Sequence, residues 1–253
     1  MELYNELVKP EIEPENYLDG NLFRKESVNV FSETDKIIHS GVMPESTLIE
    51  YMQELIKIIN SEDLPCIIKS AVVQYFIGYI HPFYDGNGRM SRFIGSQILS
   101  QSLSHLVSIR LSYLIKGNIN KYYKAFMDCN NKKNKGDITP FIMFVLNMIY
   151  DSTEDISKSL NEKLEKMIYY FDKTTEFTFE GSNQELCHEV LRVFIQNALF
   201  SSKKLDLQTI MAATNKSYNT VKTIINQLIE QNIPIVVGKN GNKHLFKLEV
   251  EKF

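Results

Sequence analysis

The chain has 253 residues, enough for one large or two moderate domains, and 43% of them are hydrophobic, yet no run approaches the roughly 18 apolar residues of a membrane-spanning helix. The formal net charge of −3 excludes bulk electrostatic attraction to nucleic acid. The N-terminal sequence lacks the basic start and apolar stretch of a secretory signal, and the three cysteines cannot all pair with one another, so we expect a cytoplasmic protein that spans no membrane.

Helical patterns dominate the first two thirds of the chain. Residues 46–60 place apolar side chains at helical spacing, namely Leu48, Met52, Leu55 and Ile59. Residues 64–80 are apolar nearly all round, which is typical of a central helix buried by its neighbours. Pro140, behind Thr139 as an N-cap, favours the start of a long helix that extends to about Tyr170.

A different pattern begins after residues 174–183, where the helical periodicity stops. It predicts three helices and then two strands joined by a Gly- and Asn-rich turn, at residues 184–198, 205–213, 218–231, 233–237 and 244–250. We therefore expect a mainly α protein of two domains, 1–175 and 184–253.

Residues 81–92 read His-Pro-Phe-Tyr-Asp-Gly-Asn-Gly-Arg-Met-Ser-Arg and carry the strongest chemical signal. A buried helix that ends in a Gly-rich turn and restarts as another helix offers free backbone N–H groups and a positive dipole end to an anion. Gly86 and Gly88 allow the backbone to approach a ligand closely, and Asn87 between them tolerates the left-handed region. The motif therefore predicts a phosphate-binding turn.

The other side chains of this motif suit nucleotide chemistry. Asp85 is a hard oxygen ligand for Mg²⁺ held mainly by substrate phosphates, and Arg89 and Arg92 can fork onto phosphate oxygens. His81 has the ordinary pKa, about 6.5, of a general base near neutral pH. Asn-Gly alone is typical of a hairpin, but neither flank alternates like a strand, and a calcium loop would need further acidic ligands.

The motif matches the Fic signature, His-x-Phe-x-Asp/Glu-Gly-Asn-Gly-Arg-x-x-Arg, at every specified position. The chain therefore resembles the Fic family of enzymes, which transfer the AMP part of ATP to a protein hydroxyl and release pyrophosphate. The resemblance implies His81 as the base, Asp85 as the Mg²⁺ ligand, Phe83 as a buried anchor, Gly86, Asn87 and Gly88 as the anion-binding loop, and Arg89 and Arg92 on the phosphates of ATP.

The resemblance extends to residues 36–44, which occupy the place of the family's flap, a short hairpin that docks the target's backbone beside the active site. The docking residues that it implies are Ile38, His39, Ser40, Gly41 and Val42. The alternative is a polar turn followed by a helix. Tyr122 and Tyr123 either flank the nucleotide or belong to the core.

The predicted C-terminal helices and hairpin resemble a winged helix-turn-helix, a module also found after some Fic domains. Its third helix is the one offered to the major groove of DNA. Residues 186–253 carry nine Lys or Arg against five Asp or Glu, a modest surplus, and the third helix has no arginine. DNA binding and protein docking both stay open, and so does a homodimer.

We therefore expect a helical Fic-domain bundle with a β-hairpin flap, followed by a small winged-helix domain. It would transfer AMP from Mg-ATP to a Ser, Thr or Tyr hydroxyl of a target protein, itself included. The alternatives are removal of AMP, another nucleotide donor, or a DNA-binding regulator that uses the Fic domain as a sensor. No segment fully matches the family's inhibitory Ser/Thr-x-x-x-Glu-Gly/Asn, whose glutamate would pair with Arg92; Glu50, Glu180 and Asp19 match in part.

Overall fold

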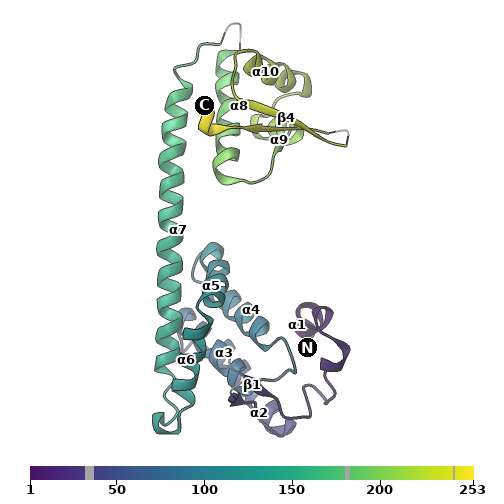
Figure 1. Ribbon diagram of the computed structural model, residues 1–253, viewed down its shortest axis with the longest axis vertical. Helices are drawn as coiled ribbons and strands as arrows, with labels where there is room; N and C mark the ends of the chain where they lie inside the picture. Colours follow the sequence, from purple (N-terminus) through teal and green to yellow (C-terminus); the bar gives the residue numbers. More distant parts are fainter. Residues whose placement is uncertain (32–36, 180–182, 242) are drawn as a thin grey trace. The chain divides into compact units, whose positions relative to one another are not determined.

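The computed structural model describes residues 1–31, 37–179, 183–241 and 243–253. The chain forms two compact units, Met1–Ile156 and Ser157–Phe253 (Figure 1). Helices dominate both units, so the predicted mainly α fold class is confirmed. Within the described ranges, no helix is long and apolar enough to cross a membrane.

The described part of the first unit contains six α-helices, two strands and the beginning of a seventh α-helix, besides short 3-10 turns. They are α1 (Glu2–Leu7), β1 (Asn29–Phe31), β2 (Ile37–Ser40), α2 (Glu45–Asn60), α3 (Cys66–Ile80), α4 (Asn87–Leu99), α5 (His105–Gly117), α6 (Ile119–Asn130) and α7 (Thr139–Thr174). The helices predicted for residues 46–60, 64–80 and 140–170 are confirmed as α2, α3 and α7.

Helix α3 lies at the centre of the first unit because both of its sides are apolar. Ala71 and Tyr75 belong to one hydrophobic cluster, shared with α5, α6 and the first turns of α7. Val73 and Ile77 belong to a second cluster, shared with α1, α2 and α4. Each fully buried aliphatic side chain contributes about 1.5–3 kcal/mol to the free energy of unfolding. Because α3 contributes side chains to both clusters, it connects them into one folded unit.

Helix α4 packs closely against α3 and thereby fixes the turn between them. The Ser70 hydroxyl of α3 donates to the backbone oxygen of Gly95 in α4 at 2.8 Å, in a fully buried position. This contact ties the side chain of α3 to the backbone of α4 away from the turn, and the short connection of residues 81–86 brings the start of α4 beside the end of α3, where the motif residues are.

The hairpin of the first unit differs from the one predicted. Strands β1 and β2 pair antiparallel, with Val30 opposite His39. Residues 36–44 thus supply only its second strand, because residues 41–44 leave the sheet, and Lys36 lies outside the described residues. The backbone N–H of Val42 instead donates to the oxygen of Ile80 at 3.1 Å, which ties the end of the hairpin to α3.

The second unit places three helices against a small sheet. Its elements after α7 are α8 (Gln184–Phe200), β3 (Leu205–Asp206), α9 (Leu207–Thr214), α10 (Tyr218–Glu230), β4 (Ile235–Asn240) and β5 (Lys243–Leu248), with strand order β3-β5-β4. The predicted order of three helices and a hairpin is observed, while β3 was not predicted, since two residues show no periodicity. That the unit is a winged-helix module stays a prediction.

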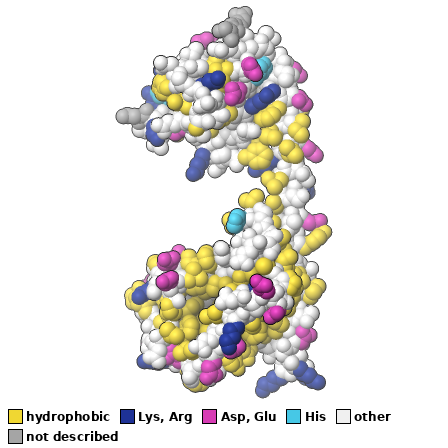
Figure 2. Space-filling model, turned by 180° about the vertical axis from the view of Figure 1, so that it is seen from behind, with side chains coloured by type: hydrophobic (Ala, Val, Ile, Leu, Met, Phe, Trp, Pro, Cys, Tyr) yellow, Lys and Arg dark blue, Asp and Glu magenta, His cyan; other side chains and the backbone are white. Residues whose placement is uncertain are grey.

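Charged side chains of both signs are interspersed over the face of the protein shown in Figure 2. This fits the small net charge of −3. Hydrophobic side chains also lie open on that face of the first unit. Among the described residues, the large hydrophobic side chains with the highest exposed fractions are on helix α5, namely Ile109 at 71% and Tyr113 at 66%.

Candidate active site

The ends of two helices bring the motif residues together. His81 follows the last residue of α3 in a left-handed conformation, with φ 52°, and its N–H donates to the oxygen of Ile77 at 2.9 Å. Gly86 precedes α4 with φ 86°, and a Cβ there would lie 2.4 Å from Cγ1 of Val8. A left-handed residue other than glycine is uncommon and persists only where its surroundings hold it. The loop is therefore a tightly specified turn.

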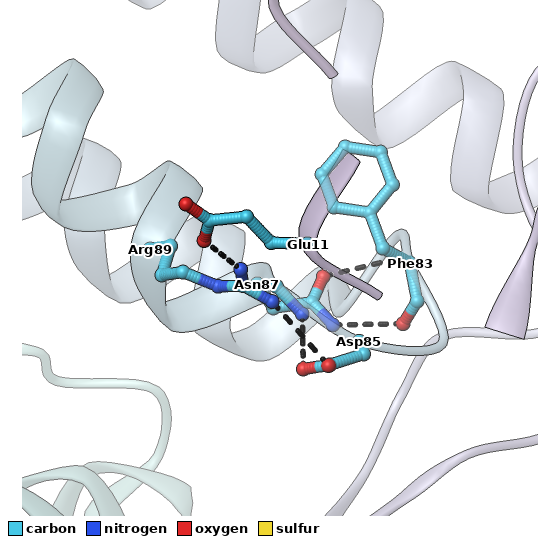
Figure 3. A network of polar contacts seen from close by, with 6 residues as sticks. Glu11, Phe83, Asp85, Asn87 and Arg89 are labelled. Atoms are coloured by element: carbon cyan, nitrogen blue, oxygen red, sulfur yellow. Dashed lines mark hydrogen bonds and ion pairs between the residues drawn. The ribbon is translucent and has the colours of Figure 1, made fainter. Parts of the chain in front are cut away.

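The side chain of Asn87 fixes the shape of this loop (Figure 3). Its Nδ2 donates to the oxygen of Phe83 at 2.7 Å, and its Oδ1 accepts from the N–H of Phe83 at 3.0 Å. Phe83 is buried, as expected, and stacks on Tyr4 with ring centroids 4.8 Å apart. The side-chain amide of Asn87 therefore bonds within the loop. The groups at the start of α4 that are suited to bind an anion are its backbone N–H groups.

His81 is held as a neutral imidazole. Burial lowers the pKa of His81 to about 4, with a further lowering by the charge of Arg24, against the opposing effect of its hydrogen bond to Gly78. Its Nδ1 lies 3.3 Å from the oxygen of Gly78. In the tautomer that donates this bond, Nε2 carries a free lone pair and can accept a proton at neutral pH.

His81 lines a cavity of about 90 Å³. The first turn of α4 forms one wall with Asn87, Gly88, Ser91 and Arg92, and α6 forms another with Ile119, Tyr122, Tyr123 and Phe126. Tyr122 also packs on Phe141 with ring centroids 5.1 Å apart, and burial raises the pKa of Tyr122 to about 12. The two interpretations of Tyr122 are therefore compatible, since it belongs to the core and lines the cavity.

Asp85 and Arg89 lie outside this cavity. The guanidinium of Arg89 lies between two carboxylates, 2.6 Å from Glu11 and 3.3 Å from Asp85 (Figure 3). Arg89 and Arg92 also line a second hollow, about 460 Å³, between α4 and α5. The structure thus brings His81, Asn87, Gly88 and Arg92 to one cavity and leaves Asp85 and Arg89 at its outer side.

Asp85 is a single carboxylate. Within the described part of the chain, no group of three or more His, Cys, Asp or Glu side chains is arranged to hold a metal ion. The Asp85 side chain is 54% exposed and accepts from the N–H of Gly86. Such a donor fits Mg²⁺ that keeps waters and takes its other ligands from substrate phosphates, as this ion commonly does.

The predicted docking residues contact their own unit as well as solvent. The ring of His39 lies on Tyr79 with centroids 4.8 Å apart, and its Nε2 is 2.6 Å from the oxygen of Tyr79. The Ser40 hydroxyl donates to Asn29 across the hairpin at 2.6 Å. The His39 side chain therefore anchors the hairpin on α3.

Sequence reasoning missed two residues at the site. Ser91 occupies a position that the motif leaves unspecified, and the structure places it in the cavity wall. Arg24 contacts the backbone of His81 although 57 residues separate the two. Neither periodicity nor spacing could have singled out Arg24, because folding brings it to His81, Ile80 and Val42 from distant parts of the chain.

Comparisons with known proteins agree with the motif. Residues 2–99 match the family model "Fic/DOC family". The chain is 40% identical over 76 residues to "Protein adenylyltransferase Fic" of Nematostella vectensis, which covers 30% of the chain and 16% of that protein. It is 29% identical over 128 residues to the protein of the same name of Drosophila yakuba, which covers 51% of the chain and 23% of that protein.

A solved structure shares the fold. It is a Fic family protein from Desulfovibrio desulfuricans G20, with a TM-score of 0.52 and 18% sequence identity, and the match covers 91% of this chain and 63% of that one. The chain spans less than a quarter of the length of the two curated relatives named above. The family match, the aligned relatives and the shared fold together support a Fic-domain protein.

Proposed function

We propose that this protein transfers the AMP part of Mg-ATP to a Ser, Thr or Tyr hydroxyl of a target protein. The observation that carries the proposal is the neutral imidazole of His81 facing a small cavity at the N-terminus of α4. A base and an anion-binding helix start around one cavity are the two parts that hydroxyl attack on a phosphate needs.

In this reaction Nε2 of His81 takes the proton of the target hydroxyl as its oxygen attacks the α-phosphorus. The bond from the α-phosphorus to the bridging oxygen breaks, and pyrophosphate leaves. Backbone N–H groups at the start of α4, and its dipole, stabilise the charge on the α-phosphate oxygens. Mg²⁺ bound with the triphosphate would neutralise its negative charge, and Asp85 is the carboxylate to which we assign a share in holding that ion.

The two arginines would act at different distances from the chemistry. Arg92 lines the cavity and can hold phosphate oxygens there. Arg89 contacts Glu11 and Asp85 outside it, in pairs whose side chains are 34–67% exposed. Exposed ion pairs contribute about 0–1 kcal/mol, so phosphate oxygens can replace these carboxylates when ATP binds.

The β1–β2 hairpin supports a protein target. Strand β2 pairs with β1 on one side, and no other described strand pairs with it. Ile37 on β2 is 60% exposed. An extended target segment can therefore add to the open edge of β2 by backbone hydrogen bonds, with side-chain contacts to residues such as Ile37.

The test is labelling with ATP that carries ³²P at either the α or the γ position, with a lysate or the purified protein itself as target. We expect protein to be labelled from the α position alone and not at all by the His81→Ala variant. Label from the γ position would indicate phosphorylation and refute the proposal. Parallel reactions with UTP and GTP, and with AMP-modified protein, separate the alternative donors and AMP removal.

We propose further that residues 184–253 form a winged-helix module. Lys239, Lys243 and Lys247 are exposed on its hairpin, which favours phosphate contact, but so are Val236 and Val237, which favours protein contact. Fluorescence anisotropy with duplex DNA at rising salt separates the two. A logarithm of affinity that falls linearly with the logarithm of salt concentration indicates DNA contact, and no binding at low salt would refute a role in DNA binding.

A further inference from the structure

Arg24 is a fully buried cation beside the candidate active site, with 0% of its surface exposed. Its guanidinium donates to the backbone oxygens of Glu26, Val42, Ile80 and His81, and it contacts the sulfur of Met43. None of these partners is a carboxylate. An arginine stays protonated in proteins, so Arg24 holds a full positive charge among backbone carbonyls.

Burying a charged side chain such as Arg24 is energetically unfavourable compared with burying an apolar one. Removing a charge from water carries a large penalty, and an apolar side chain of similar volume would commonly serve packing as well or better. The charge is tolerated because the forked guanidinium spans several carbonyl oxygens at once in a fixed geometry, which no other side chain can do. The contacts of Arg24 therefore indicate that it orients the backbone segments to which it donates hydrogen bonds.

The oriented segments are the end of α3 and the end of the hairpin. Nε of Arg24 donates to the oxygen of His81 at 2.8 Å, and its Nη2 donates to the oxygen of Val42 at 3.0 Å. At Gly41 a Cβ would lie 2.3 Å from Nη2 of Arg24 and 3.0 Å from Cβ of His81. The three residues are thus packed without room for an added methyl group.

The backbone of His81 is consequently held on both sides of its left-handed conformation. Its N–H donates to Ile77 within α3, and its carbonyl accepts from Arg24. Without the second bond, nothing among the described hydrogen bonds would fix the direction of this carbonyl. Turning this carbonyl changes ψ of His81. Because α3 and α4 hold both ends of the connection, φ of His81 must change with ψ, and a change of φ turns the Cα–Cβ bond that carries the imidazole.

We propose that Arg24 is a positioning residue, which fixes the backbone of His81 and the end of the β1–β2 hairpin in one frame. The general base and the edge that docks the target then keep a constant relation to each other. This inference rests on the proposed function, in which His81 is the base and the hairpin is the docking edge.

The test compares Arg24→Gln and Arg24→Lys with Lys69→Met. Lys69 is a matched control because it is also a buried cation, 8% exposed, whose Nζ donates to backbone oxygens, those of Ile59 and Ser61, without contacting the motif. The measurements are kcat for AMP transfer, ATP affinity by calorimetry, the His81 ring resonances by NMR, and the unfolding midpoint of each variant.

We expect Arg24→Gln to lower kcat by about 100-fold or more and to change ATP affinity by less than about threefold, because the base is displaced while the phosphate site at α4 is kept. The His81 resonances should move in Arg24→Gln and stay in place in Lys69→Met. Arg24→Lys keeps the charge but loses the fork, so it should recover less than about a tenth of the lost rate. Full recovery by lysine would overturn the proposal in favour of charge alone.

The NMR comparison separates this proposal from the proposed function. If the wild-type protein transfers no AMP, the proposed function fails, but movement of the His81 resonances in Arg24→Gln still supports the positioning role. Unmoved resonances in folded Arg24→Gln would overturn the positioning role, and so would equal losses of kcat in Lys69→Met. If Arg24→Gln does not fold, Arg24→Lys carries the same measurements.

Discussion

The lowered pKa of His81 predicts an unusual pH dependence for AMP transfer. Burial lowers that pKa from its ordinary 6.5 to about 4. A base must be unprotonated to act, and kcat/KM reports the pKa values of the unliganded enzyme, so kcat/KM should stay flat from neutral pH down to about pH 5 and fall only as pH approaches 4. At pH 5 a group of pKa 4 is about 90% neutral, whereas an ordinary histidine is about 3% neutral, a difference of roughly thirty-fold in rate.

The assay is kcat/KM for Mg-ATP between pH 4 and 8, with the His81 ring of the unliganded protein titrated by NMR over the same range. Circular dichroism at each pH checks that the protein stays folded, and His81→Ala gives the background rate. An acid limb centred near pH 6.5 in both measurements would refute the reasoning, because it would mean that the imidazole is solvated. If the rate shows an acid limb near pH 6.5 while the His81 ring does not titrate there, the limb belongs to another group.

The same shift affects stability. Between about pH 4 and 6.5 the unfolded chain binds a proton at His81 and the native protein does not, so the free energy of unfolding should fall as pH falls through this window. The full loss below pH 4 is on the order of 3 kcal/mol at most. Burial also lowers the pKa of His39, which adds in the same direction. Urea unfolding of His81→Asn should show a smaller loss of stability between pH 7 and 4 than the wild type.

Five further variants test the site. His81→Ala should lower AMP transfer by about 10²–10⁴-fold with ATP affinity nearly unchanged, as measured by single-turnover kinetics and calorimetry. Asp85→Ala should raise the Mg²⁺ concentration needed for activity, while Arg92→Ala should weaken ATP binding at any Mg²⁺ concentration; titrations of both ligands distinguish the two. Glu11→Gln should change the transfer rate by no more than about fivefold, since its pair with Arg89 is exposed. Gly86→Ala should cost about 1–3 kcal/mol in urea unfolding, because its φ is 86° and an added Cβ would lie 2.4 Å from a neighbouring side chain.

The elements that the sequence predicts best are those set by local patterns. The all-round apolar character of α3 indicates a central helix because no other position in a small domain can bury both of its sides. The stripe of α2 is confirmed by the burial of Leu48 and Leu55. The hairpin is predicted less well, because its paired residues Val30 and His39 are nine positions apart. In addition, neither strand shows a clear alternation of apolar and polar residues. A two-residue strand such as β3 exists only through its partner β5.

At the site, the motif predicts which chemical groups are present but not which of them share a cavity. Asn87 carries an amide that would suit an anion, yet that amide closes the loop on Phe83. Arg89 and Arg92 are equivalent in the motif, yet only Arg92 lines the cavity with His81. Such distinctions depend on the packing of α4 against distant segments, and a linear pattern does not contain them.

The contacts of the acidic residues argue against a resident inhibitor among the described residues. No salt bridge within 4.0 Å joins Arg92 to a carboxylate in the described part of the chain. Asp19 accepts instead from the N–H of Lys25 and the hydroxyl of Tyr84, and Glu180 lies outside the described residues. Glu11 does contact the motif through Arg89, in an exposed ion pair. A buried ion pair costs about 3–5 kcal/mol to break, whereas an exposed pair such as this one contributes about 0–1 kcal/mol. Phosphate oxygens can therefore replace Glu11 on Arg89. We expect the wild-type protein to transfer AMP without any activating substitution.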